Sequence, residues 1–213
     1  MLLSPAVRKD PSMLGQQHYA RSEHDHYPTP PKATQAFLDH PYVASLIADR
    51  VIWEPACGNG AIVKVIAPQV RATYATDLVV YPGDFEPDGL GDFYAIKDLQ
   101  RDLSLVVGRT IEAPDGIVTN PPYGKDAERF ARHALELMRP VGGFVAMLCR
   151  HEWDAAKGRK DLFDSPAFAA KITLRFRPRW FENTTGAPRH SYAWYVWSWA
   201  KDAATPPMTL YAG

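Results

Sequence analysis

The sequence contains little cysteine and no long uninterrupted apolar segment. Its 213 residues include 2 cysteines, Cys57 and Cys149, which are too few for a disulfide framework. The longest apolar runs, residues 142–149 and 192–200, are far shorter than the roughly 20 residues that a membrane-spanning helix needs. Residues 1–5 show no basic segment followed by an apolar core. We therefore expect a cytoplasmic protein without a signal peptide or a membrane span.

The sequence also lacks a net charge, because 24 basic residues balance 24 acidic ones. A strongly basic nucleic-acid-binding composition is thereby excluded. The charges are unevenly distributed, however: residues 77–128 contain 4 basic and 11 acidic residues, whereas residues 150–190 contain 9 basic and 5 acidic ones. The second region is compatible with a basic face that meets phosphates and equally with a solvated surface of scattered charges.

Two common phosphate-binding motifs are missing, namely Gly-x-Gly-x-x-Gly and Gly-Lys-Ser/Thr. Instead, a predicted strand ending at Glu54 leads through a turn of small residues into an apolar helix over residues 61–67. Gly58 and Gly60 permit positive φ angles and leave no Cβ in the way. Such a turn brings the backbone close to a ligand at the carboxyl edge of an α/β sheet.

A second unusual segment, Asn120-Pro121-Pro122-Tyr123, follows the short apolar run 116–119. The two prolines stop the predicted strand and hold the following residues in one geometry. The Asn120 side-chain oxygen and a fixed backbone carbonyl offer two acceptors for a planar NH₂ group, and Tyr123 offers a flat face for a ring. The segment thus predicts a site for an amino group on a heteroaromatic ring, although two prolines after an Asn also form an ordinary turn.

The motif Glu54-Pro55-Ala56-Cys57-Gly58-Asn59-Gly60 resembles the S-adenosylmethionine motif of adenine-specific DNA methyltransferases. The segment 120–123 resembles the catalytic motif of the N6-adenine enzymes in that family. The resemblance runs from about Tyr27 to Trp199, with the N-terminal Thr-Pro-Pro motif first. It implies a class I methyltransferase fold, which is a Rossmann-like α/β domain. Its mostly parallel, seven-stranded sheet would have a reversed last strand and helices on both faces.

The resemblance also implies S-adenosylmethionine as the cofactor, DNA as the partner and no metal. The cofactor-binding residues that it implies are Tyr27, Thr29, Glu54, Ala56, Cys57, Gly58, Gly60, Asp77, Asp92, Phe93 and Asn120. Within this set, Asp77 would hold the ribose, and Asp92 with Phe93 would hold the cofactor's adenine. Thr29 could instead be only a helix N-cap, and Asp92 could be a cap beside a buried Phe93.

The resemblance assigns catalysis to Asn120, Pro121, Pro122 and Tyr123. Asn120 and the Pro121 carbonyl would accept the hydrogens of the target amine, and Tyr123 would stack on the target base. In a duplex, this requires the base to flip out of the stack. No general base is demanded, because an ammonium product loses its proton readily.

The rest of the chain divides into a flexible arm at residues 1–23, a methyltransferase domain at 24–200 and a tail at 201–213. We expect His24-Asp25-His26 to be a surface loop rather than a metal site. Two helices broken at His40-Pro41 precede the glycine motif. After the catalytic segment we expect a helix from Lys125 to Pro140, a buried strand at 142–149, a helix at 160–170, and antiparallel strands at 172–176 and 192–199. The third strand has no clear sequence signal.

Two segments, residues 150–160 and 177–190, should lie at the same sheet edge as the catalytic segment. Guanidinium groups interleaved with an aromatic residue suit phosphates and unstacked bases, although they are also typical of a solvated strand face. The DNA-contact residues that we predict are Arg150, Lys157, Arg159, Arg177, Arg179, Trp180, Arg189 and His190.

The predicted function is methyl transfer to the N6 amine of adenine in DNA, with low or site-directed specificity. A compact enzyme of this kind would suit a phage or a restriction-modification system, and a partner could supply specificity. The alternative is an amino-methyltransferase acting on ribosomal RNA, at adenine or guanine, or on a protein glutamine. A third interpretation is a regulatory cofactor-binding subunit, for which a damaged catalytic motif would be expected.

Overall fold

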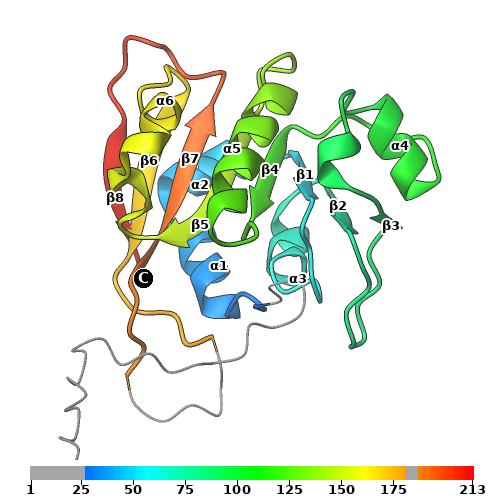
Figure 1. Ribbon diagram of the computed structural model, residues 1–213, viewed down its shortest axis with the longest axis horizontal. Helices are drawn as coiled ribbons and strands as arrows, with labels where there is room; N and C mark the ends of the chain where they lie inside the picture. Colours follow the sequence, from blue (N-terminus) through cyan, green and yellow to red (C-terminus); the bar gives the residue numbers. More distant parts are fainter. Residues whose placement is uncertain (1–26, 181–186) are drawn as a thin grey trace, which may run out of the picture.

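The computed structural model describes residues 27–180 and 187–213, so the expected arm at 1–23 and the His24-Asp25-His26 cluster lie outside the described residues. Within the described part of the chain, one eight-stranded sheet has helices on both faces (Figure 1). The strands are β1 (Val51–Glu54), β2 (Ala72–Asp77), β3 (Gly89–Leu90), β4 (Gly116–Thr119), β5 (Phe144–Arg150), β6 (Phe168–Leu174), β7 (Tyr192–Ser198) and β8 (Met208–Ala212).

The α-helices are short, apart from α5, which follows the Asn-Pro-Pro-Tyr segment at 120–123. They are α1 (Pro31–Leu38), α2 (Pro41–Ile47), α3 (Val63–Ile66), α4 (Arg101–Val107), α5 (Lys125–Met138) and α6 (Lys160–Phe163). Single 3₁₀ turns complete the connections: η2 (Ala67–Gln69), η3 (Phe93–Ala95), η4 (Trp153–Ala155) and η5 (Lys157–Arg159). No helix in residues 27–180 or 187–213 has the length and apolar character needed to cross a membrane.

The sheet order is β3-β2-β1-β4-β5-β7-β6-β8, and every strand except β7 runs in the same direction. The Rossmann-like fold, the mostly parallel sheet and the reversed strand at 192–198 are therefore confirmed. The expected number of strands was wrong, because the described residues form eight. The additional strand, β8, pairs with β6 inside the segment expected to be a tail, so the reversed strand is not the last. Only five residues long, β8 is too short to show a clear alternation in the sequence.

Alternate strand residues divide the core between the two faces of the sheet. Ile52 and Val118 pack with α1, α2 and α3, whereas Trp53 and Ile117 pack with α4, α5 and α6. The central strands β1, β4 and β5 are buried on both faces, which explains their continuous apolar sequences. Because β1 and β4 are adjacent and parallel, their carboxyl ends bring residue 54 and residue 120 to one edge of the sheet.

Two local predictions need correction. The expected helix at 160–170 ends at Phe163, because β6 begins at Phe168 and pairs along β7 as the antiparallel partner. Pro166 in the connection cannot continue a helix with a normal backbone hydrogen bond. Thr29 is not the N-cap of α1, since Pro30 occupies that position and makes no side-chain cap hydrogen bond. The third strand proves to be the two-residue β3, beyond the reach of any periodic signal.

Candidate active site

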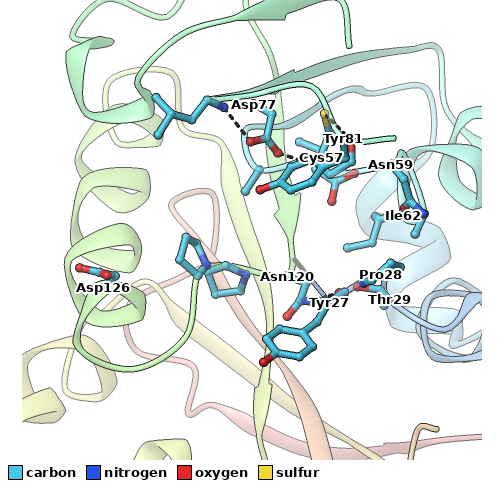
Figure 2. Close-up of a pocket in the computed structure, with 17 residues that line it drawn as sticks. Tyr27, Pro28, Thr29, Cys57, Asn59, Ile62, Asp77, Tyr81, Asn120 and Asp126 are labelled. Carbon is cyan, nitrogen blue, oxygen red and sulfur yellow. Dashed lines mark hydrogen bonds between the residues drawn. The ribbon is translucent and has the colours of Figure 1, made fainter. Parts of the chain in front are cut away.

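A cavity of about 420 Å³ lies at the carboxyl ends of β1, β2 and β4 (Figure 2). Ligand-binding pockets commonly have this size. Its walls come from the segment before α1, the turn after β1, the connection after β2 and the turn after β4, together with one residue of α5. The lining residues are Tyr27, Pro28, Thr29, Glu54, Ala56, Cys57, Gly58, Asn59, Ala61, Ile62, Asp77, Leu78, Tyr81, Asn120, Pro121, Pro122 and Asp126.

The turn after β1 approaches the cavity with its backbone. Gly58 and Gly60 have φ angles of +55° and +74°, a region that residues with a Cβ rarely adopt. A Cβ on Gly60 would also lie 2.4 Å from the ring of Phe85, which covers this turn from the β2–β3 connection. Both glycines are therefore required by the local geometry. Gly58 lines the cavity, whereas Gly60, which was predicted to bind the cofactor, is not among the described residues that line it.

Asp77, at the end of β2, holds this turn in place. Its Oδ2 accepts a hydrogen bond from the Gly58 N–H (2.8 Å), and its Oδ1 accepts one from the Leu78 N–H (2.7 Å). The side chain is only 7% exposed and lines the cavity. Oδ1 also accepts a longer hydrogen bond from the Val79 N–H (3.5 Å). A carboxylate has about four lone-pair sites, so the Asp77 carboxylate can still accept from a hydroxyl group of a ligand.

Glu54, at the end of β1, is a buried acid with an unsatisfied oxygen. It is 4% exposed, and its Oε2 has no hydrogen-bond partner within the described parts of the chain. Burial raises the pKa of this carboxyl well above its usual value, the Val63 N–H offsets part of that rise, and the charge of Asp77 adds to it. A buried carboxyl of this kind favours a cationic ligand, because a positive charge would restore its ionised form.

Asn120 is held by the segment that precedes α1. Its Nδ2 donates to the backbone oxygen of Tyr27 at 3.3 Å, while its buried Oδ1 has no partner among residues 27–180 and 187–213. Since a carbonyl can only accept, the amide nitrogen must face Tyr27 and the oxygen must be the group left over. An unsatisfied acceptor of this kind costs about 1–3 kcal/mol, which a donor from a ligand would recover.

Tyr123 does not occupy the position expected for a platform under the target base. Its ring packs edge-on against Tyr27, with centroids 5.6 Å apart, and against Trp180 at 6.2 Å. It is not among the described residues that line the cavity, and burial raises the pKa of its hydroxyl well above the usual value. In this conformation, neighbouring aromatic side chains occupy the space beside its ring.

Asp92 and Phe93 also lie outside the set of described residues that line the cavity. The Asp92 side chain caps η3 by accepting from the Tyr94 N–H (2.9 Å). The Phe93 ring is 6% exposed and stacks on Phe130 at 4.1 Å. The structure therefore shows the alternative arrangement, a cap beside a buried Phe. The loop remains close to the site, because the Gly91 N–H donates to the Asp77 backbone oxygen.

Several cavity residues were not found from the sequence. Leu78 directly follows Asp77 and is 62% exposed, so it presents apolar surface at the cavity. Its position after the acid at the end of β2 was the signal that could have identified it. Tyr81 lies in a loop without periodicity, and Asp126 lies apart from the other labelled residues on α5 (Figure 2). The other missed residues are Pro28, Asn59, Ala61 and Ile62.

Most of the predicted DNA-contact residues are exposed, although none is among the described residues that line the cavity. Arg159 is an exception, because it donates to Glu128 Oε1 (2.9 Å) and to the Trp153 carbonyl (2.6 Å). Arg159 therefore links η5 to α5, and its guanidinium is occupied by contacts within the chain. Lys157, Arg179 and Arg189 are exposed.

Arg150, Arg177, Trp180 and His190 belong to the same side of the site. The Trp180 ring packs on the Tyr192 ring, with centroids 5.1 Å apart. Tyr192 is the register partner of Arg150 in the β5–β7 pair. Arg177 Nη1 donates to the Pro188 carbonyl at 3.4 Å. No group of three or more His, Cys, Asp or Glu side chains in the described residues could hold a metal ion.

Comparison with solved structures identifies the fold. A protein from Pyrococcus horikoshii, provisionally assigned as an RNA methyltransferase, aligns with a TM-score of 0.58 and 13% identity, over 82% of this chain and 88% of that one. A Listeria monocytogenes protein, provisionally assigned as a class I S-adenosylmethionine-dependent methyltransferase, gives 0.52 and 15%, over 92% and 68%. The chain has the class I methyltransferase fold.

The M protein of the type I restriction enzyme EcoKI shares this class I methyltransferase fold, with a TM-score of 0.52 and 17% identity. The alignment covers 80% of this chain and 43% of the M protein, so this chain spans less than half of that subunit's length. No protein-family model matches the chain, and no curated protein matches it in sequence. At these identities, the likeness concerns the fold, and the function has to be argued from the site.

Proposed function

We propose that this chain is an S-adenosylmethionine-dependent methyltransferase that acts on the exocyclic N6 amine of adenine in DNA. The observation that supports this most directly is Asn120, which lines the cavity with its Nδ2 fixed by Tyr27. Its Oδ1 has no partner within the residues that the structure describes. A fixed, unsatisfied acceptor at the cavity is suited to the hydrogen of a planar amine.

The cavity residues fit S-adenosylmethionine. The Glu54 carboxyl, whose Oε2 has no partner among the described residues, would face the ammonium group of the cofactor's amino-acid portion, and Asp77 would accept from its ribose hydroxyls. Leu78 would offer apolar surface to the adenine ring, while the peptide groups around Gly58 permit close approach. When bound, this cofactor supplies an electrophilic methyl group on a sulfonium.

The catalytic contribution of the protein would come from the turn after β4. The nitrogen of adenine's amine is a poor nucleophile because its lone pair is delocalised into the ring. Asn120 Oδ1 and the Pro121 carbonyl would accept its two hydrogens and draw it out of the ring plane, which returns electron density to the nitrogen. That nitrogen would accept the methyl group that a bound cofactor supplies, with the sulfonium sulfur as the leaving group, and would lose one proton to solvent. Pro122 keeps the two acceptors in one geometry.

A duplex substrate would have to present its adenine outside the helix. The amine lies within the base stack, so it reaches a recessed acceptor pair only after the nucleotide rotates out. The Tyr123 ring could then contact the flipped base only if Tyr27 or Trp180 moved away from it. Asp92 and Phe93 would need a similar rearrangement to reach a cofactor, so we propose Leu78 and Tyr81 in their place.

Specificity for a DNA sequence would be low, or a partner would supply it. The similarity to an M protein of a restriction enzyme supports a DNA substrate and a partner-dependent arrangement, as in restriction-modification. A second candidate is methyl transfer to an amine in RNA, favoured by the similarity to the Pyrococcus horikoshii protein. The Asn120 acceptor would suit either substrate, because both present the same planar amine.

The test uses the purified full chain with methyl-labelled S-adenosylmethionine and DNA from cells that lack adenine methylation. After digestion to nucleosides, the label should appear in N6-methyladenine, and Asn120→Ala should remove at least 99% of it. Ribosomal RNA from the same cells serves as the competing acceptor. Label in RNA alone would assign the second candidate, and label in neither would contradict both.

A further inference from the structure

The two sides of the cavity carry opposite charge. Residues 77–92, which include the cavity residues Leu78 and Tyr81, contain five acidic residues and no Lys or Arg. The described segments 175–180 and 187–190 contain four Arg and no acidic residue. The sheet order places β2 and β3 on one side of β1 and β4, and places β5 and β7 on the other. The site thus has an acidic rim next to β2 and β3 and a basic rim next to β5 and β7, the strands that Figure 1 shows on opposite sides of β1 and β4.

Three side chains of the basic rim come from different segments and lie close together. Arg150 ends β5, and His190 lies just before β7, whose Tyr192 is the register partner of Arg150. Arg177 is joined to the 187–190 segment through Pro188. The pKa of His190 is lowered first by partial burial and then by Arg150 and other neighbouring arginines, against one opposing charge from Glu152.

The basic rim connects to the catalytic turn through a row of aromatic rings. Tyr192 contacts Trp180 at 5.1 Å, and Trp180 contacts Tyr123 at 6.2 Å. Tyr123 belongs to the same rigid turn as Asn120. A phosphate bound at the basic rim would therefore lie beside the target position, on the side away from the acidic rim.

We propose that a nucleic-acid strand crosses the β5–β7 rim, where Arg150, Arg177 and His190 bind the phosphates that flank the target nucleotide and Trp180 contacts a neighbouring base. This inference rests on the proposed function, because it places the backbone of that function's substrate. The acidic rim repels phosphates, so the strand leaves the site without crossing the β2–β3 connection. Backbone binding of this kind carries no sequence information, in agreement with low specificity.

The test measures binding of the full chain to a fluorescent DNA duplex, and to RNA of the same sequence, across a series of salt concentrations. The slope of log K against log salt is negative, and each phosphate contact that is lost reduces its magnitude by roughly 0.9 on duplex DNA. The Arg150→Gln/Arg177→Gln double variant should therefore reduce the magnitude of the slope by about 1.8. Cofactor binding and thermal melting establish that the variant is folded.

Two control variants define the path of the strand. Arg139→Gln removes an exposed positive charge just beyond the far end of α5 and should leave the slope unchanged. Asp84→Asn/Glu86→Gln removes two exposed acids from the opposite rim and should also leave it unchanged. The inference is overturned if Arg139→Gln reduces the magnitude of the slope as much as the Arg150→Gln/Arg177→Gln variant does. It is also overturned if the Arg150→Gln/Arg177→Gln variant leaves the slope unchanged.

The outcomes also separate this inference from the proposed function. Loss of slope on RNA, with no binding to DNA, supports the strand path and contradicts the DNA assignment. Failure of the wild-type chain to bind either nucleic acid at low salt overturns the strand path, whatever the methyl-transfer assay shows. Methylation of DNA together with an unaffected double variant supports the proposed function and overturns the strand path alone.

Discussion

The side-chain nitrogen of Asn120 donates to the backbone oxygen of Tyr27 across 93 positions of the chain, at 3.3 Å. This bond joins the segment before α1 to the turn after β4, and both segments line one cavity. It also determines which end of the amide faces Tyr27. The orientation of the proposed catalytic acceptor therefore depends on a segment that lies 93 positions earlier in the sequence.

Asn120→Asp separates the two tasks of this side chain. The variant keeps an acceptor but loses the donor to Tyr27, and a carboxylate oxygen would face the Tyr27 carbonyl. We expect kcat to fall about 10²-fold, because one misaligned acceptor commonly costs that much. Asn120→Ala, which removes the acceptor altogether, should fall further. Single-turnover kinetics at saturating cofactor measure both, and equal rates for the two variants would contradict the acceptor role.

Glu54→Gln should stabilise the protein while weakening cofactor binding. Burial raises the pKa of Glu54 in the folded state, so its favourable contribution is complete below the unfolded value of about 4.3 and is lost as pH rises through the folded pKa. The neutral amide suffers no such loss. The variant's free energy of unfolding should therefore exceed that of wild type increasingly as pH rises.

The matching measurement for Glu54→Gln is calorimetric titration with S-adenosylmethionine between pH 6 and pH 9. Wild-type affinity should increase with pH while the cofactor's amino group stays protonated, up to about pH 8, because the ionised carboxyl is the form that holds an ammonium group. The variant should bind at least ten-fold more weakly with a flatter profile. Identical profiles would show that Glu54 does not face the cofactor.

Gly60→Ala tests the packing of the glycine turn. Its φ of +74° and the nearby ring of Phe85 both oppose a Cβ. We expect destabilisation of about 1–3 kcal/mol from backbone strain, measured by urea unfolding. Adding Phe85→Ala to Gly60→Ala should remove the part of the destabilisation that comes from the clash with the ring. The part that comes from the positive φ should remain. The close contact would be contradicted if the loss of unfolding free energy in the double variant equalled or exceeded the sum of the losses in the two single variants.

Tyr195→Phe tests how the basic rim is positioned. The Tyr195 hydroxyl donates to the His151 carbonyl (2.6 Å) and lies 3.2 Å from Asp154 Oδ1, which Lys171 also holds. Its removal takes this donor from the part-buried His151 carbonyl, whereas Asp154 Oδ1 keeps its bond to Lys171, and should cost about 1–3 kcal/mol. Nucleic-acid affinity should fall several-fold with unchanged cofactor affinity. Tyr211→Phe, at an exposed tyrosine, is the matched control and should change neither.

The resemblance of two motifs to a known family predicted the class of fold, and local chemistry predicted much of the cavity wall. Gly58 and Gly60 occupy positions that need positive φ, and the two prolines end β4 as expected. The same locality explains the predicted ends of β1 and β2, at Glu54 and Asp77. The positions of side chains at the carboxyl ends of buried strands could thus be predicted from the apolar pattern of each strand.

The sequence did not predict features that depend on distant contacts. Tyr123 is drawn toward Tyr27 and Trp180, which no local pattern reveals. Arg159 is neutralised by Glu128 from another helix, and β8 becomes a strand only because β6 offers it an edge. The roles of Asp92 and Phe93 were transferred by resemblance, and the core packing of Phe93 places it elsewhere.

The most direct test of the central claim is the N6-methyladenine content of DNA from a host without adenine methylation that expresses the full chain. We predict methylated adenine with the wild-type chain, and none above background with Asn120→Ala expressed to the same level. Unmodified DNA from cells whose purified wild-type chain binds S-adenosylmethionine would contradict the assignment to DNA adenine. Equal methylation by both chains would contradict the role of Asn120.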